Sequence, residues 1–273
     1  MDYRRPAPAA RALTTIVGPD DPAGSGLTLV CGTLGFGATH AIVADEAETL
    51  VVVMGGRIHA RVGDWTARGV GARLDPFGGA PHALYVPRDA AIEIMGASSP
   101  DADLAIVRVP AARAFAPVHI LPTDVSAFER GAANWRRLER SIVDGGFAAD
   151  RLIAGETLVD PGNWSEVPPA RDAAAVGNGA VVRVHHLRLA PSSGFALQYL
   201  YGAGREADVP VVLRDRDSVV IPGGYFPLVA APGHAMYYVW AIAGPARALL
   251  QYEDPQYAWL QAAERVVGRR PTP

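Results

Sequence analysis

The stretch "ETLVVVMGG", residues 48–56, joins a run of leucine and valine to two consecutive glycines. Short runs that are rich in β-branched residues and end at Gly or Pro predict β-strands. Runs of the same kind surround it in the first half of the chain: "LTLVCG" (27–32), "RIHARV" (57–62), "HALYVP" (82–87), "AIEIMG" (91–96) and "DLAIVRVP" (103–110). This succession favours an antiparallel sandwich or barrel over alternating βαβ units.

The second half of the chain repeats the pattern. Its strand-like runs are "GAVVRVHHLRL" (179–189), "GFALQYLYG" (194–202), the long segment 209–233 and "HAMYYVWAIAGP" (234–245). The order of motifs also echoes the first half, because "HALYVPRDAAIEI" leading to "DLAIVRVPAARA" resembles "SVVIPGGYFPLV" leading to "MYYVWAIAGPARA". Internal similarity of this kind predicts two copies of one β module in an all-β chain.

Two segments depart from the strand pattern. Apolar residues in 124–145 recur at near-helical spacing, so a short helix is expected near Ala132 to Val143. Asp254 and Pro255 open a second predicted helix at the C-terminus. The predicted segments are therefore an N-terminal arm (1–25), an N-terminal β module (26–125), a helical linker (126–150) and a C-terminal β module with the terminal helix (151–273).

Composition limits the chemistry that this chain can perform. All 25 basic residues are arginine, which excludes a lysine Schiff base and a lysine general base. Cys31 is the single cysteine, which excludes an intrachain disulfide and a cysteine-built zinc site, and we expect it to be buried. The net charge of −3 with scattered arginines argues against nucleic-acid binding, and no apolar run reaches the roughly 18 residues that span a membrane. We expect a cytoplasmic protein.

Several motifs carry a resemblance to a known family. These are "ETLVDPGNWSEVPP", "GFALQYLY" and "DRDSVVIPGGYFPLVAAPGHAMYYVWAIAGPAR", with "ALYVPRDAAIEI" and "ERGAANWRR" in the first half. From about residue 27 to residue 260, the chain resembles the 5-deoxy-glucuronate isomerase family of inositol catabolism, which has a two-cupin (bicupin) fold. The resemblance implies a metal-dependent aldose–ketose isomerase, whose C-terminal cupin holds a divalent ion with three His and one Glu.

All four implied ligand positions are changed in this chain. They fall on Ala170, Asp172, Arg183 and Phe226, of which only Asp172 could bind a metal. A guanidinium at this place would repel a cation, so we expect neither a metal nor another cofactor. In the first module, His40 and Glu48 resemble an incomplete ligand set. A histidine at a strand edge and a solvated glutamate are the readings we favour there.

Strand alternation selects the side chains that face the altered pocket. If Arg183 points inward, His185 lies on the same face, and an imidazole suits proton transfer at neutral pH. We expect His185 to be the proton shuttle, Arg183 to stabilise negative charge and Asp172 to pair with Arg183. Purely structural readings stay open for all three: a hydrogen-bonded histidine on the barrel wall, and an ion pair that only shapes the mouth.

The expected substrate-binding residues make the pocket drier and more aromatic than a sugar site. They are Trp164, Gln198, Tyr201, Tyr225, Phe226 and Tyr238. The sequence therefore favours a metal-independent isomerase or cyclase of specialised metabolism, acting on a partly hydrophobic small molecule. The alternatives are a genuine 5-deoxy-glucuronate isomerase and a non-catalytic ligand-binding bicupin. Exposed sheet edges make a homodimer possible.

Overall fold

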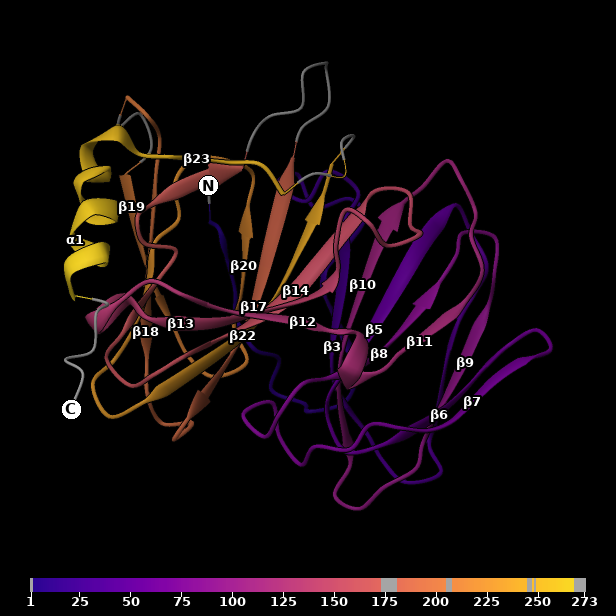
Figure 1. Ribbon diagram of the computed structural model, residues 1–273. Coiled ribbons are helices and arrows are strands. Elements are labelled where there is room, and N and C mark those ends of the chain that lie inside the picture. The colour runs from indigo at the N-terminus through magenta and orange to yellow at the C-terminus, as the bar shows by residue number, and fades with distance from the viewer. Residues whose placement is uncertain (1, 173–180, 205–207, 245–246, 248, 268–273) are drawn as a thin grey trace.

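The computed structural model describes residues 2–172, 181–204, 208–244, 247 and 249–267 of the 273 in the chain. Within them, strands form most of the regular secondary structure, with one α-helix, α1 (Trp259–Val267), on the outer side of the C-terminal half (Figure 1). Two β-sandwiches lie side by side, so the predicted all-β bicupin fold is confirmed. Among the described residues, no helix is long and apolar enough to cross a membrane.

The first sandwich consists of two antiparallel sheets. Its six-stranded sheet has the order β11 (Val118–Ile120), β8 (His82–Val86), β5 (Ala47–Gly55), β10 (Ala102–Pro110), β3 (Thr28–Leu34) and β2 (Thr14–Val17). Its four-stranded sheet has the order β4 (Thr39–Ile42), β9 (Ile92–Gly96), β6 (Ile58–Val62) and β7 (Trp65–Val70). The opening run of valines is β5, which lies inside the larger sheet between β8 and β10. Its burial on both faces explains why it does not alternate with polar residues.

The second sandwich has a larger main sheet. Its seven strands are ordered β1 (Arg4–Arg5), β20 (Ser218–Ile221), β17 (Val182–Ala190), β22 (Ala235–Ala243), β14 (Leu152–Val159), β13 (Arg137–Val143) and β12 (Ser126–Arg130). A four-stranded sheet covers its inner face, in the order β15 (Trp164–Ser165), β21 (Leu228–Ala230), β18 (Ala196–Tyr201) and β19 (Asp208–Leu213). A separate ladder pairs β16 (Ala170–Asp172) with β23 (Gln251–Glu253).

The helix predicted in the linker 126–150 is wrong. This segment forms β12 and β13, joined by a short 3-10 turn at Ala133–Trp135. β13 pairs with β12 on one side and with β14 on the other, so a near-helical spacing of apolar residues was overridden by strand pairing. The C-terminal helix is confirmed: the Asp254 side chain accepts a hydrogen bond from the Gln256 amide at the 3-10 turn that begins at Pro255 and precedes α1.

The N-terminal arm reaches across to the second sandwich. Strand β1 pairs with β20, and the Arg4 side chain donates to Asp217 at 2.8 Å. Arg5 binds both carboxylate oxygens of Asp21 within the same arm. Residues 2–25 are thus held by ion pairs and by strand addition, and both β1 and β2 belong to the sheets.

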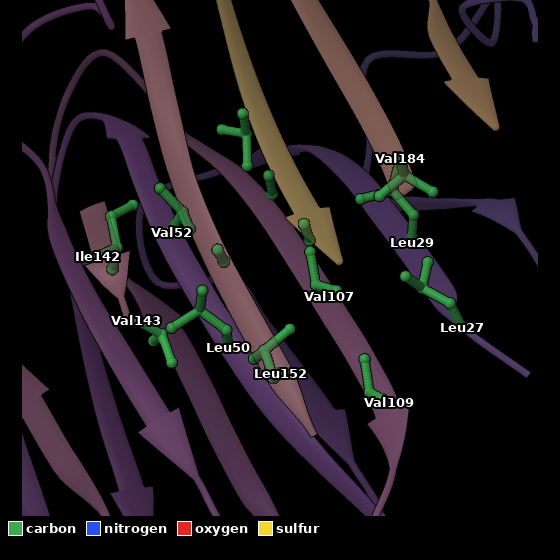
Figure 2. Close-up of a cluster of buried hydrophobic side chains, with 14 of the residues drawn as sticks. Leu27, Leu29, Leu50, Val52, Val107, Val109, Ile142, Val143, Leu152 and Val184 are labelled. Carbon is green, nitrogen blue, oxygen red and sulfur yellow. The ribbon is translucent and has the colours of Figure 1, made fainter. Parts of the chain in front are cut away.

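The two sandwiches share an apolar core where their large sheets face each other. Figure 2 shows side chains of this cluster from both halves of the chain. Leu29, Leu50 and Val107 come from the first half, and Leu152 and Val184 come from the second. All of them are buried. Because sheet faces pack through such interdigitating side chains, this core fixes how the second sheet lies against the first.

Buried glutamates add directional bonds to this core. Glu156 accepts from Arg73 at 2.8 Å, from Arg140 at 2.7 Å and from the Tyr237 hydroxyl at 2.8 Å. Arg73 precedes β8 in the first half, whereas the other three residues lie in the main sheet of the second half. The Glu156 carboxylate therefore joins the two halves of the molecule.

Glu48 performs a similar structural task, contrary to our expectation of a solvated side chain. It is fully buried, and Tyr85 donates its hydroxyl hydrogen to it at 2.8 Å. The amides of Asp150, Arg151 and Leu152 donate to the same carboxylate at 2.7–2.8 Å. The sequence could not reveal these partners, because they lie about a hundred residues further along the chain.

We expect Glu156→Gln to destabilise the protein by about 3–5 kcal/mol, because it leaves the buried guanidinium of Arg73 without a full counter-charge. Glu93→Gln is the matched control, since it removes a carboxylate from an exposed pair with Arg61 and should cost less than about 1 kcal/mol. Apparent unfolding midpoints in urea measure both effects. Equal midpoints for the two variants would contradict a stabilising role of the buried network.

Candidate functional site

The inner strand β17 carries two of the three predicted catalytic side chains, Arg183 and His185, while Asp172 lies on β16. Strand β17 lies between β20 and β22, and successive side chains point to opposite faces of the sheet. Val184 belongs to the core between the two halves, while Leu187 belongs to the interior of the second sandwich. The expected alternation is confirmed: Arg183, His185 and Leu187 face inward.

Arg183 is held by one carboxylate and two aromatic rings. Its Nε and Nη2 atoms donate to the two oxygens of Asp172 at 2.8 and 2.6 Å. The guanidinium carbon lies 4.8 Å from the Phe226 ring centroid and 5.4 Å from that of Trp240. Burial acts to lower the pKa of Arg183, but the adjacent Asp172 carboxylate outweighs it and raises this pKa above its ordinary value. The site thus contains a permanent positive charge.

His185 lies deeper in the sandwich than the ion pair and is fully buried. Its ring stacks at a tilt on Tyr238, with centroids 4.7 Å apart, and contacts Phe226 edge-on. Burial lowers the pKa of His185 well below its ordinary value, and the charge of Arg183 lowers it further. The imidazole is therefore neutral at physiological pH.

Gln198 defines which nitrogen of His185 carries the hydrogen. The Gln198 Nε2 atom lies 3.0 Å from the carbonyl oxygen of Phe226, so it must be the amide nitrogen that points there. The same atom lies 3.3 Å from Nδ1 of His185, which must then accept. The hydrogen of the neutral imidazole accordingly resides on Nε2 of His185. Neither this His185 nitrogen nor the Oε1 atom of Gln198 has a hydrogen-bond partner among the described residues.

Tyr238 connects the imidazole to a carboxylate that our sequence analysis overlooked. Its hydroxyl donates to Oε1 of Glu166 at 2.8 Å and lies 2.6 Å from the Ser165 hydroxyl. Glu166 is buried, and its backbone has φ of 56°. Burial raises the pKa of Glu166, against the opposing charges of Arg183 and Arg137. The adjacent Ser165 and Glu166 in "GNWSEVPP" were the only sign of this carboxylate in the motif. The sequence did not reveal that Glu166 is buried or that its backbone is left-handed.

The expected substrate-binding residues divide into two groups. Gln198, Phe226 and Tyr238 surround His185, as described above. Tyr201 and Tyr225 stack on each other at 4.9 Å, and the Tyr201 hydroxyl donates to Asp254 near α1. Trp164 is 38% exposed at the end of β15, and no described contact joins it to the histidine. Only the first group belongs to the same cluster as Arg183 and Asp172.

Comparison with known proteins shows the family of this chain. The model of the KduI/IolB family matches residues 7–260. The chain belongs to the KduI/IolB family. It is 30% identical over 224 residues to a 5-deoxy-glucuronate isomerase of Geobacillus thermodenitrificans strain NG80-2, covering 81% of this chain and 80% of that protein. The corresponding protein of Bacillus subtilis strain 168 is 27% identical over 231 residues, covering 83% and 84%.

Solved structures show the same fold. An IolB-like protein from Salmonella typhimurium LT2 has a TM-score of 0.88 at 24% identity, covering 96% of this chain and all of that one. Oxalate decarboxylase from Bacillus subtilis has a TM-score of 0.62 at 10% identity, covering 92% and 78%. The family resemblance expected from the motifs is confirmed, together with its cupin-type fold.

Within this KduI/IolB fold, the residues at the four implied ligand positions do not fit a metal ion. Ala170 offers no side-chain donor atom, and the Phe226 ring lies against a guanidinium. Asp172, the one potential ligand, has both oxygens bonded to Arg183. In the part of the chain that the structure describes, no group of three or more His, Cys, Asp or Glu side chains could hold a metal. An internal ion pair takes the place of a ligand set.

The first sandwich offers a cavity but no complete ligand set. The cavity has a volume of about 660 Å³, and His40 lines it beside Arg108. The guanidinium of Arg108 is paired with Asp45 at 2.6 Å. Glu48 does not line this cavity, because its carboxylate is directed to the amides at the start of the second half. The pairing of His40 with Glu48 that we considered is therefore not formed.

Both histidines of β17 make stability depend on pH. His186, which we expected to be a surface or wall residue, is buried against Ser218, and burial lowers its pKa to about 3. An unfolded chain takes up a proton near pH 6.5 at each position, whereas the folded one does not. Stability is therefore complete above pH 6.5 and falls as the pH decreases from there toward 5.

We expect His185→Gln and His186→Asn each to remove part of this dependence. At pH 5.5, each neutral histidine contributes a slope of about 1 kcal/mol per pH unit. Urea unfolding between pH 7.5 and 5 measures the slope for each variant. An unchanged slope in either variant would mean that the histidine in question takes up its proton in the folded state.

Proposed function

We propose that this chain is an isomerase that moves a proton within a small hydroxy-carbonyl acid by means of its own side chains, without the metal that the family resemblance implies. The observation that carries this proposal is the pair of unpartnered buried atoms beside the guanidinium, Nε2 of His185 and Oε1 of Gln198. Buried polar groups without partners are rare and costly in native proteins. A donor and an acceptor of this kind suit a substrate with a carbonyl and a hydroxyl group.

Arg183 supplies the charge that such a reaction requires. Removal of a proton next to a carbonyl produces an enediolate, and a fixed cation in a dry site stabilises that negative charge. The Asp172 side chain is 12% exposed while that of Arg183 is 3% exposed, so Asp172 lies on the solvent side of the pair. A substrate carboxylate or enediolate can replace Asp172 at the guanidinium, because both bind it in the same two-point geometry.

His185 acts as a hydrogen-bond donor in this proposal. Because its hydrogen is on Nε2 and its pKa is low, the ring presents a neutral N–H to the carbonyl oxygen. This differs from the base that we expected from the sequence. A neutral imidazole paired with a carboxylate base is an established way to interconvert a hydroxy-aldehyde and a hydroxy-ketone.

The relatives indicate which substrate class to test first. They are named 5-deoxy-glucuronate isomerases, and the aldehyde end of such a sugar acid offers a carbonyl for His185 and, as an enediolate, a negative charge for Arg183. The aromatic rings of Phe226 and Tyr238 against the imidazole favour a second candidate. In this candidate function, a less polar molecule of specialised metabolism is rearranged or cyclised while the aromatic rings hold it in one conformation.

We expect purified protein to convert 5-deoxy-glucuronate at the same rate before and after dialysis against EDTA. The physical reason is that Arg183, and not an ion, stabilises the developing charge. Metal analysis of the same sample provides the control. One tightly bound transition metal per chain, whose removal abolishes turnover, would refute the metal-free proposal.

We expect His185→Gln to lower kcat by about 10²–10⁴-fold, because the N–H that polarises the carbonyl is lost. His234→Gln is the matched control on the same sandwich, since that ring bonds only to the Pro232 carbonyl in the described structure and should leave kcat unchanged. Steady-state kinetics with folded variants gives both values. Equal kcat values of the two variants would contradict this role of His185. Absence of turnover in the folded wild-type protein would favour the remaining alternative, a non-catalytic ligand-binding bicupin.

A further inference from the structure

We propose that Glu166 is the base that removes the carbon-bound proton of the substrate, and that Tyr238 positions its carboxylate. This inference rests on the proposed function and assigns a further residue to the same site. It is drawn from the hydrogen bonding, the backbone conformation and the surroundings of Glu166.

The hydrogen bonding of Glu166 differs from that of the other two buried glutamates. Glu48 accepts four hydrogen bonds through both of its oxygens. Glu156 is bonded by two arginines and a tyrosine, again through both oxygens. Among the described residues, Glu166 accepts one hydrogen bond, from Tyr238 to Oε1. A carboxylate has about four acceptor sites, so Oε2 of Glu166 retains its capacity to accept a proton.

The backbone at Glu166 adopts a conformation that is unfavourable for a residue with a side chain. Its φ of 56° lies in the left-handed region, which costs a residue with a side chain roughly 1–2 kcal/mol. Burying a carboxylate with a single hydrogen bond adds to this cost. Strain that persists at a buried polar group is characteristic of functional sites. Here it directs the carboxylate to Tyr238, directly after the β15 strand has ended at Ser165.

The charges around Glu166 suit a base that works beside an anion. Burial has the largest effect on Glu166 and raises the pKa of its carboxyl, while the charges of Arg183 and Arg137 oppose this rise. Arg137 is itself bonded to Glu139 at 2.8 Å and to a backbone carbonyl. The guanidinium of Arg183 pairs with Asp172, and its charge also acts on the carboxylate of Glu166. A carboxylate with a raised pKa is a stronger base, and this one lies close enough to Arg183 to feel the cation that would bind the enediolate.

The proposed reaction balances without an oxidant or a co-reactant. The C2–H bond of a 2-hydroxy-aldehyde breaks and its proton moves to Oε2 of Glu166. The electron pair enters a C1–C2 double bond, and the enediolate charge faces Arg183. Glu166 then returns the proton to C1, forming the new C–H bond. The hydroxyl proton passes from O2 to O1, and both oxygens lie within reach of the His185 N–H in this scheme.

Solvent exchange of the carbon-bound hydrogen tests this role directly. In D₂O, 5-deoxy-glucuronate with wild-type protein should acquire deuterium at the carbon next to the carbonyl, as followed by proton NMR. Glu166→Gln keeps an acceptor for the Tyr238 hydroxyl but removes the base, so exchange should fall by at least about 100-fold. Glu253→Gln is the control, because that carboxylate bonds to Gln261 on the outside of the same sandwich. It should exchange like the wild type.

A second variant distinguishes a role of Glu166 as the base from a purely structural role. Glu166→Gly adopts the positive φ without strain and leaves space for a small acid. Added formate should restore exchange to Glu166→Gly in proportion to its concentration, and should not affect Glu166→Gln. Normal exchange in Glu166→Gln, or no rescue of a folded Glu166→Gly, overturns the inference alone. Absence of both exchange and turnover in the wild-type protein overturns the proposed function and this inference together.

Discussion

The buried guanidinium of Arg183 is the constraint on which the candidate site depends. A guanidinium keeps its proton in proteins, so its charge must be compensated in place. The Asp172 carboxylate does this with two hydrogen bonds, and the ring faces of Phe226 and Trp240 cover the remaining surface. The same charge helps to keep His185 neutral. A positive charge thus remains where the family resemblance implies a metal, but a side chain now carries it.

The scaffold supports this site from the opposite face of the same strands. Tyr237 and Tyr238 are neighbours on β22, and strand alternation directs them to opposite faces of the sheet. The Tyr237 hydroxyl bonds to Glu156 between the two halves, whereas that of Tyr238 bonds to Glu166 in the site. The fully bonded carboxylate of Glu156 therefore fixes the strand that positions the partly bonded one. Site residues on such a rigid strand keep their geometry better than residues on loops.

Features of the fold and site could be predicted from the sequence when the interacting residues are close together along the chain, and were missed when they are far apart. The inward direction of Arg183 and His185 followed from a period of two residues, which is local information. The strand at 137–143 was missed because its neighbours β12 and β14 override a local spacing. The burial of Glu48 was missed because the three backbone amides that bind it lie about a hundred residues away. Glu166 combines both difficulties, since its conformation is local but its partner Tyr238 is 72 residues distant.

The ion pair also bears on which substrates can enter the reaction. A neutral, apolar molecule would leave Asp172 bound to Arg183 and would gain nothing from the guanidinium. In the proposed function, a molecule that becomes an enediolate exchanges one ion pair for another, so the cation loses little stabilisation while this anion is bound. Removing the Asp172 carboxylate without a replacement would leave a buried charge unpaired, which costs several kcal/mol. Under the proposed function, the pair therefore favours substrates that become anionic at the guanidinium over the apolar ones suggested by Phe226 and Tyr238.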